Sequence, residues 1–209
     1  MEEGSYLTLG GQGEIEYVER RSRFLAHARP VTTEEEALAF LEQIRSKYWD
    51  ASHNVYAYSL REGQIRRFSD DGEPQGTSGM PTLEVLTKSG ITDAIIVVTR
   101  YFGGVLLGAG GLVRAYSHEA RMAVDAAEVL TMRPCTVGEL RCDYTQYGKL
   151  AALLPAMEGV VEDTIFEADV CLKFHIPTEL CVRLDKQLAD ATCGQVAAEY
   201  GEEKFFPAK

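Results

Sequence analysis

The densest group of chemically versatile side chains lies in the segment from Asp70 to Gly79. Asp70, Asp71 and Glu73 place three carboxylates within four positions, and oxygen ligands at that density are typical of sites that hold Mg²⁺ or position a reactive water. The same segment also fits a chain reversal, because Asp-Gly is a favoured turn dipeptide and proline fixes its own φ angle. The composition favours the turn, and the three carboxylates remain weak candidates for metal ligands.

The second candidate site is the glycine-rich segment from Arg100 to Arg114, which runs from an expected buried strand into an expected helix. Glycine permits close backbone approach and amides at a helix N-terminus attract anions, so a phosphate or carboxylate would fit here. A tight strand-to-helix turn explains the glycines equally well. The candidate binding residues of this segment are Arg100, Tyr101, Phe102, Gly103, Gly104, Gly108, Gly110, Gly111 and Arg114.

Familiar nucleotide-binding loops fit this segment poorly. Val113 stands where a dinucleotide fingerprint needs a small residue, and Ala109 stands where a phosphate-binding loop needs lysine. Arg100 also has a structural alternative, because an arginine at the end of a buried strand can pair with a carboxylate such as Asp71 or Glu73. Whether the two segments meet in space is left open by the sequence.

Three further residues complete the candidate binding set: Gly76 and Thr77 of the Asp70 to Gly79 segment, and His53 outside both segments. His53 begins an expected strand and is capable of acid or base chemistry near neutral pH. A histidine in such a position more often fills a structural hydrogen-bonding slot.

The bulk composition excludes several classes of protein. The net charge of −11 argues against a chain that coats nucleic acid, so contact with RNA would need a local basic groove. The five cysteines form no metal-binding or redox spacing and are interpreted as reduced and mostly buried. No apolar run spans a membrane and the N-terminus lacks the parts of a secretory signal, so we expect a cytoplasmic protein without membrane contact.

Hydrophobic periodicity predicts an α+β protein of two domains, residues 1–133 and 134–209. In the first we expect strands over 13–18, 23–28, 53–60, 64–69 and 93–100 and helices after Thr33, between Pro81 and Gly90, and through Ala127. The strands over 53–60 and 64–69 should form a hairpin, and the strand over 93–100 should be buried on both faces. In the second, strands over 140–144, 160–166, 168–176 and from 195 alternate with two helices in the βαββαβ order of a ferredoxin-like fold.

At the two candidate segments the chain closely resembles the YigZ family, the bacterial relatives of the IMPACT proteins. The similar stretches are Ser22-Arg23-Phe24, His53-Asn54, the loop from Asp70 to Pro81, and Val97 through Tyr116. The resemblance implies a first domain like ribosomal protein S5 domain 2 and a second like domain V of elongation factor G. Eukaryotic members regulate translation through protein contacts and carry a further domain that this chain lacks. One departure in detail is Ser78, where the family usually has alanine.

The resemblance and the residues together favour a translation-associated regulatory protein over an enzyme. We expect it to contact RNA, the ribosome or a translation factor through Arg100-Tyr101-Phe102-Gly103-Gly104, with Arg100 and Arg114 reaching phosphate and one aromatic ring stacking. One alternative is an enzyme or sensor that binds a small phosphorylated ligand with Mg²⁺, with His53 as a base. Another is a protein–protein adaptor. No cofactor is expected, and the oligomeric state stays open.

Overall fold

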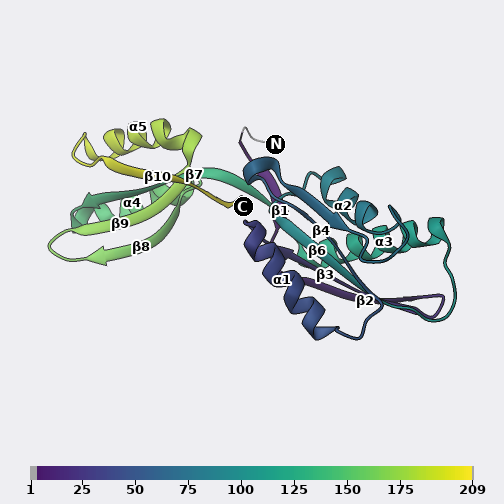
Figure 1. Cartoon of the computed structure of the whole chain (residues 1–209). Coiled ribbons are helices and arrows are strands. Elements are labelled where there is room, and N and C mark those ends of the chain that lie inside the picture. Colours follow the sequence, from purple (N-terminus) through teal and green to yellow (C-terminus); the bar gives the residue numbers. More distant parts are fainter. Residues whose placement is uncertain (1–3, 209) are drawn as a thin grey trace. The chain divides into compact units, whose positions relative to one another are not determined.

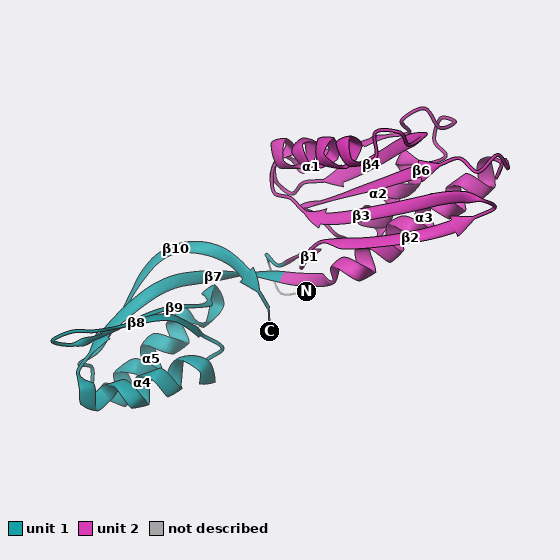
Figure 2. Cartoon of the chain, turned by 90° about the horizontal axis from the view of Figure 1, so that it is seen from below, with its two compact units in different colours: residues 1–5, 132–209 teal, residues 6–131 magenta. Residues whose placement is uncertain are grey.

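The computed structural model describes residues 4–208, so the first three residues of the expected N-terminal domain lie outside the described part. The described chain forms two compact units (Figures 1 and 2). Residues 6–131 make up the N-terminal unit, and residues 132–208 together with Gly4 and Ser5 make up the C-terminal unit. The units therefore divide between residues 131 and 132, whereas the sequence placed the boundary between 133 and 134.

The N-terminal unit is built on a sheet of five antiparallel strands in the order β2-β3-β6-β4-β5. These strands are β2 (Gly13–Glu19), β3 (Ser22–Pro30), β4 (His53–Ser59), β5 (Arg66–Ser69) and β6 (Ala94–Tyr101). The central strand is β6, and its residues 94–100 are all buried, as its run of β-branched side chains predicted. The expected hairpin is confirmed by the pairing of β4 with β5.

Three helices cover this sheet on its two faces (Figure 1). Ile95 and Val97 of β6 pack with the apolar stripe of α1 (Glu34–Lys47), whereas Ile96 and Val98 pack with α2 (Gly79–Lys88) and α3 (Ala109–Ala127). Alternate residues of a strand point to opposite faces, so α1 lies on one face and α2 with α3 on the other. The candidate site lies at the start of β4, the end of β6 and the start of α3.

Local sequence signals account for where two of these helices begin. Thr33 precedes α1 and its hydroxyl accepts the N–H of Glu36 at 3.2 Å, which confirms the expected cap. The carboxylate of Glu36 accepts the N–H of Thr32 rather than that of Thr33, so only half of the capping box forms. Helix α2 begins at Gly79, two residues before the expected start at Pro81. Pro81 therefore lies in the first turn, where proline is tolerated because first-turn amides have no hydrogen-bond partner within the helix.

The C-terminal unit has the predicted ferredoxin-like arrangement. Its elements are β7 (Val129–Cys142), α4 (Tyr144–Ala156), β8 (Val160–Phe166), β9 (Val170–Pro177), α5 (Cys181–Thr192) and β10 (Ala198–Pro207), with a short 3₁₀ helix at Thr178–Leu180. The first three residues of β7 belong to the N-terminal unit. The four strands pair antiparallel in the order β10-β7-β9-β8. Apolar residues of α4 and α5 share one core with β7 and β9.

The sequence misjudged the strands that begin each unit. Strand β7 starts at Val129 and contains Pro134, whereas the sequence expected a strand only from Leu140. Proline is tolerated there because pairing with β9 begins one residue later, at Cys135, so Pro134 faces only β10 within the described register. The short strand β1 (Tyr6–Leu9), which pairs with β7, was not expected at all.

The structure also bears on the cysteines and on membrane contact. All five cysteines are free; Cys135, Cys142 and Cys171 are buried, Cys181 is half-buried and Cys193 is exposed. Within residues 4–208, every helix is too short or too polar to cross a bilayer.

Candidate functional site

The loop from Asp70 to Gly79 and the glycine-rich segment meet around one pocket of the N-terminal unit, with a volume of about 330 Å³. We call it the Arg100 pocket. Its polar lining comes from His53, Glu73 and Arg100, and its apolar lining mainly from Phe102, Leu106, Leu107 and Leu112. The first turn of α3, at Gly108 and Ala109, completes it. The two segments that the sequence singled out therefore form one site.

Asp70 closes its loop by capping α2. Its Oδ1 accepts the N–H groups of Ser78 at 3.1 Å and Gly79 at 2.8 Å, and its Oδ2 accepts the N–H of Gly76 at 2.8 Å. The Ser78 hydroxyl donates a further bond of 2.7 Å to Oδ1. Burial raises the pKa of this carboxyl, but the donors of Gly76, Ser78 and Gly79 outweigh burial and hold the pKa below its ordinary value. Asp70 is thus a structural anion at a helix N-terminus.

Asp71 fastens the same loop to β4. Its Oδ2 accepts the N–H of Asn54 at 2.6 Å, and its Oδ1 lies 3.3 Å from an Arg45 guanidinium nitrogen. Its backbone is in the left-handed region, with a φ of 46°. The two other loop residues in the candidate set are Gly76, which is exposed with a φ of 76°, and Thr77, whose hydroxyl donates to the carbonyl of Pro74.

The three acidic side chains of this loop therefore face different partners. Asp70 contacts amides of its own loop, Asp71 contacts Asn54 and Arg45, and Glu73 contacts Arg100. Within residues 4–208 no group of three or more His, Cys, Asp or Glu side chains is arranged to hold a metal ion. The segment is a chain reversal that its own carboxylates stabilise, which is the turn that its composition favoured.

Arg100 is buried rather than presented to solvent. The expectation that it reaches RNA phosphate is therefore wrong, and the structure has the alternative that the sequence left open, a pair with Glu73. Its side chain is 5% exposed and that of Glu73 is 4% exposed. Nη1 donates to Glu73 Oε1 at 2.6 Å, and Nη2 donates to the Ser22 hydroxyl at 3.1 Å. The guanidinium lies over the rings of Phe24 and Phe102.

Tyr116 of α3 completes this buried cluster. Its hydroxyl donates to Glu73 Oε1 at 2.8 Å, and burial together with the charge of Glu73 raises the pKa of the phenol. The sequence analysis included Tyr116 only in the helix expected to run through Ala127 and in the stretch that resembles the YigZ family. A signal was available, because a tyrosine buried on a helix stripe needs a partner for its hydroxyl.

His53 lies beside Glu73 and is held by the loop. Its Nδ1 is 2.8 Å from the carbonyl oxygen of Asp71, which only accepts, so the proton of an uncharged ring is assigned to Nδ1. Nε2 lies 3.8 Å from Glu73 Oε1, and the side chain is 21% exposed. His53 therefore occupies a structural hydrogen-bonding slot and still presents one ring nitrogen to the Arg100 pocket.

Close packing explains the first glycine of the glycine-rich segment. A Cβ on Gly103 would lie 2.0 Å from the carbonyl oxygen of Arg21, so only glycine fits against the β2–β3 turn. Gly104 and Gly108 have φ angles of 79° and 71°, which glycine adopts without strain. Gly110 and Gly111 lie in the first turn of α3. Tight turning and close approach thus account for most of this glycine pattern.

The two aromatic residues of the segment have different environments. Tyr101 donates its hydroxyl to Asp50 Oδ1 at 2.8 Å and is half-buried. Phe102 is 47% exposed and lines the Arg100 pocket. Of the two rings, Phe102 is therefore the one that a ligand can contact.

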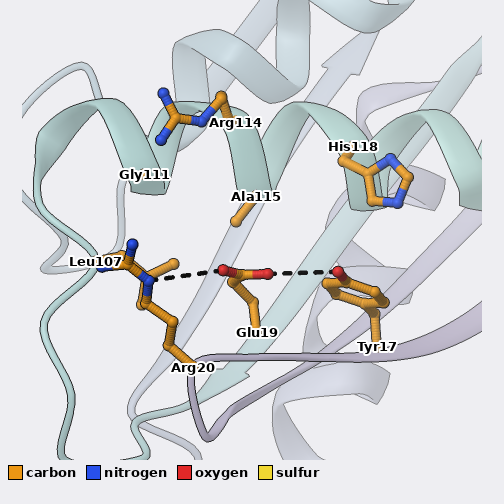
Figure 3. A pocket seen from close by; sticks show the side chains of 8 residues that line it. All are labelled: Tyr17, Glu19, Arg20, Leu107, Gly111, Arg114, Ala115 and His118. Carbon is orange, nitrogen blue, oxygen red and sulfur yellow. Dashed lines mark hydrogen bonds and ion pairs between the residues drawn. The ribbon is translucent and has the colours of Figure 1, made fainter.

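A second hollow lies beside the first turns of α3 and has a volume of about 210 Å³ (Figure 3). We call it the basic hollow; its lining includes Tyr17, Glu19, Arg20, Leu107, Arg114 and His118. Glu19 lies between Arg20 Nε, at 3.8 Å, and the Tyr17 hydroxyl, at 3.3 Å. The rings of Tyr17 and His118 meet edge to face, with centroids 5.5 Å apart. Arg114 is exposed and makes no hydrogen bond or ion pair with the described residues.

The β2–β3 turn brings Arg20 to this hollow. Glu19 pairs with Ser22, so Arg20 and Arg21 form a two-residue loop, and their φ angles of 46° and 68° are both left-handed. Non-glycine residues rarely adopt that conformation, and the sequence carried no glycine or asparagine to announce the turn. For this reason the sequence analysis did not bring Arg20 to Arg114.

Comparison with protein families assigns both parts of the chain. Residues 20–124 match the Impact N-terminal domain, and residues 140–195 match a domain of unknown function, DUF1949. IMPACT family member YvyE of Bacillus subtilis is 35% identical over 199 residues, which cover 95% of this chain and 92% of that protein.

Two further relatives extend the comparison. A crystal structure of a hypothetical protein superimposes with a TM-score of 0.61 at 33% identity, covering 96% of this chain and 98% of the other. The IMPACT homologue of Dictyostelium discoideum is 40% identical over 105 residues, which cover 48% of this chain and 29% of that longer protein. The similarity to the Dictyostelium protein thus covers about half of this chain.

Proposed function

The chain belongs to the IMPACT family, and from that membership we propose that it is a translation-associated protein that binds RNA phosphate through the basic hollow. The link to translation rests on the family, whose eukaryotic members resemble the N-terminal half of this chain. The RNA contact rests on Arg114, an exposed cation beside Arg20 at the start of α3. The proposed contact is therefore at Arg114 and Arg20 instead of at the buried Arg100.

The charge distribution supports a local contact of this kind. The whole chain carries a net charge of −11, which argues against a bulk attraction to nucleic acid. The lining of the basic hollow includes two arginines, Arg20 and Arg114, and one carboxylate, that of Glu19, which lies near Arg20 and accepts a hydrogen bond from the Tyr17 hydroxyl. One positive charge is therefore in excess at this surface, and it is the charge of Arg114.

The rings around the hollow support contact with unpaired bases. Tyr17 is 41% exposed and His118 is exposed, and both line the basic hollow. Single-stranded RNA is held by cations along its backbone and by aromatic faces on which its bases stack. Phe102 lines the Arg100 pocket, which shares Leu107 with the basic hollow, and it is a third exposed ring.

Substituting Arg114→Ala is expected to lower the affinity for a single-stranded RNA oligomer about fivefold at physiological salt, because one phosphate contact is lost. The slope of log K against log salt should fall by about 0.7. Fluorescence polarisation over a salt series measures both quantities. Co-sedimentation with ribosomes, performed with the same two proteins, tests whether the contact operates on structured RNA.

The matched control is Arg121→Ala. Arg121 is an exposed arginine of the same helix, where it contacts Ser89 and Asp125 outside the hollow. Loss of affinity in Arg114→Ala with little change in Arg121→Ala supports the proposed surface. Equal loss in both variants, or none in either, would contradict it.

A further inference from the structure

The Arg100 pocket contains a buried carboxylate with one oxygen left for a ligand. Glu73 Oε1 takes the bonds from Arg100 and Tyr116, whereas Oε2 accepts no hydrogen bond from the described residues. Oε2 is not fully buried, and Glu73 lines the Arg100 pocket, so we place this oxygen at the surface of the pocket. A carboxylate whose side chain is 4% exposed normally has each oxygen satisfied.

His53 adds a second acceptor at the same end of the pocket. With its Nδ1 bonded to the Asp71 carbonyl, the uncharged ring presents the lone pair of Nε2 next to Glu73. Two acceptors side by side suit a ligand group with several N–H donors, such as an ammonium group.

Groups of the opposite character line another part of this pocket, at the first turn of α3. The first hydrogen bond within this helix runs from the N–H of Leu112 to the carbonyl of Gly108, so the amides of residues 109–111 precede it. Of these residues, Ala109 lines the Arg100 pocket, whereas Gly111 lines the basic hollow. Gly108 supplies no side-chain cap, and the first turn contains no acidic residue. In the other long helices of this unit a side-chain oxygen accepts a first-turn N–H group, that of Thr33 in α1 and that of Asp70 in α2. A ligand carboxylate in the Arg100 pocket would satisfy the amide of Ala109.

The charges of the pocket select a ligand that carries both groups. Arg100 and Glu73 neutralise one another, so an anion alone would meet an adjacent carboxylate, and an amine alone would meet the positive end of α3. A zwitterion satisfies both ends without adding net charge. Phe102, Leu106, Leu107 and Leu112 supply apolar surface for the rest of such a molecule. At about 330 Å³ the pocket is at the small end of the range for ligand sites.

We propose that the Arg100 pocket binds a free α-amino acid with an apolar side chain, its ammonium group on Glu73 and His53 and its carboxylate on the amide of Ala109 at the start of α3. This proposal does not depend on RNA binding, which uses the basic hollow. Either one can fail while the other holds, because the calorimetry described next contains no RNA.

The test is titration calorimetry of the full chain with leucine and with molecules that each lack one of its parts. We expect leucine to bind saturably, and 4-methylpentanoate, 3-methylbutylamine and glycine to bind at least tenfold more weakly. The acid lacks the ammonium group, the amine lacks the carboxylate, and glycine lacks the apolar side chain. Phenylalanine in place of leucine tests whether a larger apolar group is accepted.

Ala109→Trp is the variant that blocks the pocket without disturbing the core. Ala109 is exposed in the first turn of α3, so a large side chain there fills the pocket instead of a packed interior. We expect leucine binding to fall at least tenfold, with an unchanged melting temperature. The matched control is Met122→Trp, at an exposed position on the same helix, which should bind as the wild type does.

Two results would overturn the proposal. The first is no saturable binding of either amino acid to the wild-type chain. The second is 4-methylpentanoate or 3-methylbutylamine binding as tightly as leucine, which would assign the pocket to a simple anion or a simple amine.

Discussion

Replacing Arg100 with alanine is expected to lower the free energy of unfolding of the N-terminal unit by about 3–5 kcal/mol. The substitution removes one partner of a buried ion pair and leaves the Glu73 carboxylate, 4% exposed, with only the Tyr116 hydroxyl as a strong donor. It also removes the guanidinium between the rings of Phe24 and Phe102. The cost of an uncompensated buried charge and the cost of a cavity then add to one another.

Urea unfolding monitored by circular dichroism, with amide hydrogen exchange of β6, measures this loss in the correct unit. The control is Arg45→Ala, which breaks a more exposed pair with Asp71, with side chains 37% and 31% exposed. Such pairs contribute about 1 kcal/mol or less. If Arg100→Ala lost no more stability than Arg45→Ala, the description of Arg100 and Glu73 as a buried ion pair would be contradicted.

A double substitution separates the charge from the packing. Arg100→Met combined with Glu73→Met removes both charges and keeps apolar volume at both positions. We expect the double variant to recover part of the stability lost in Arg100→Met alone, because no unpaired charge is left. The remaining loss reflects the Tyr116 hydroxyl, which then lacks its acceptor.

The burial of Arg100 also decides which arginine is suitable for a test of RNA binding. From the sequence, Arg100 appears as the basic residue that opens the glycine-rich segment, and Arg100→Ala would be chosen as a binding mutant. A fall in affinity of that variant would not distinguish lost contact from lost fold. Arg114→Ala avoids the ambiguity because Arg114 is exposed at the basic hollow.

The fold was largely predictable because its signals are local or periodic. The β-branched run of β6 required burial on both faces, Thr33 with Glu36 marked the start of α1, and Arg61 to Gly63 marked the β4–β5 hairpin. The failures lie where partners distant in sequence decide. Strand β1 has four residues and depends on pairing with β7, and β7 contains a proline that local rules read as a stop.

The sequence predicted where the candidate site lies but not what each of its residues contacts. Residue types identified both segments, but the direction of each side chain depends on contacts across the fold. Arg100 and Glu73 are 27 positions apart and Arg100 and Ser22 are 78 apart, so no spacing rule connects them. Arg20 reaches the basic hollow through a turn whose left-handed residues are both arginines, a choice that turn preferences disfavour.

One buried group has no role in either the Arg100 pocket or the basic hollow. Glu119 of α3 is fully buried, and neither of its carboxylate oxygens has a hydrogen-bond partner. Burial raises the pKa of this carboxyl from an ordinary 4.5 to about 7. Its ionised form is therefore disfavoured in the folded chain relative to the unfolded chain.

We expect Glu119→Leu to stabilise the chain at pH 8, by as much as about 3 kcal/mol, since each unit of pKa shift corresponds to about 1.4 kcal/mol. Because the folded pKa is the higher one, the wild type loses stability as pH rises from about 4.5 to about 7, and the loss is complete above that range. The advantage of the variant should therefore shrink by about 2–3 kcal/mol between pH 8 and pH 5. Urea unfolding at both pH values measures it, with Glu84→Gln, an exposed carboxylate paired to Lys88, as the control. An advantage that stays constant with pH would show that Glu119 does not titrate in this range, and that its cost to the fold is one of packing alone.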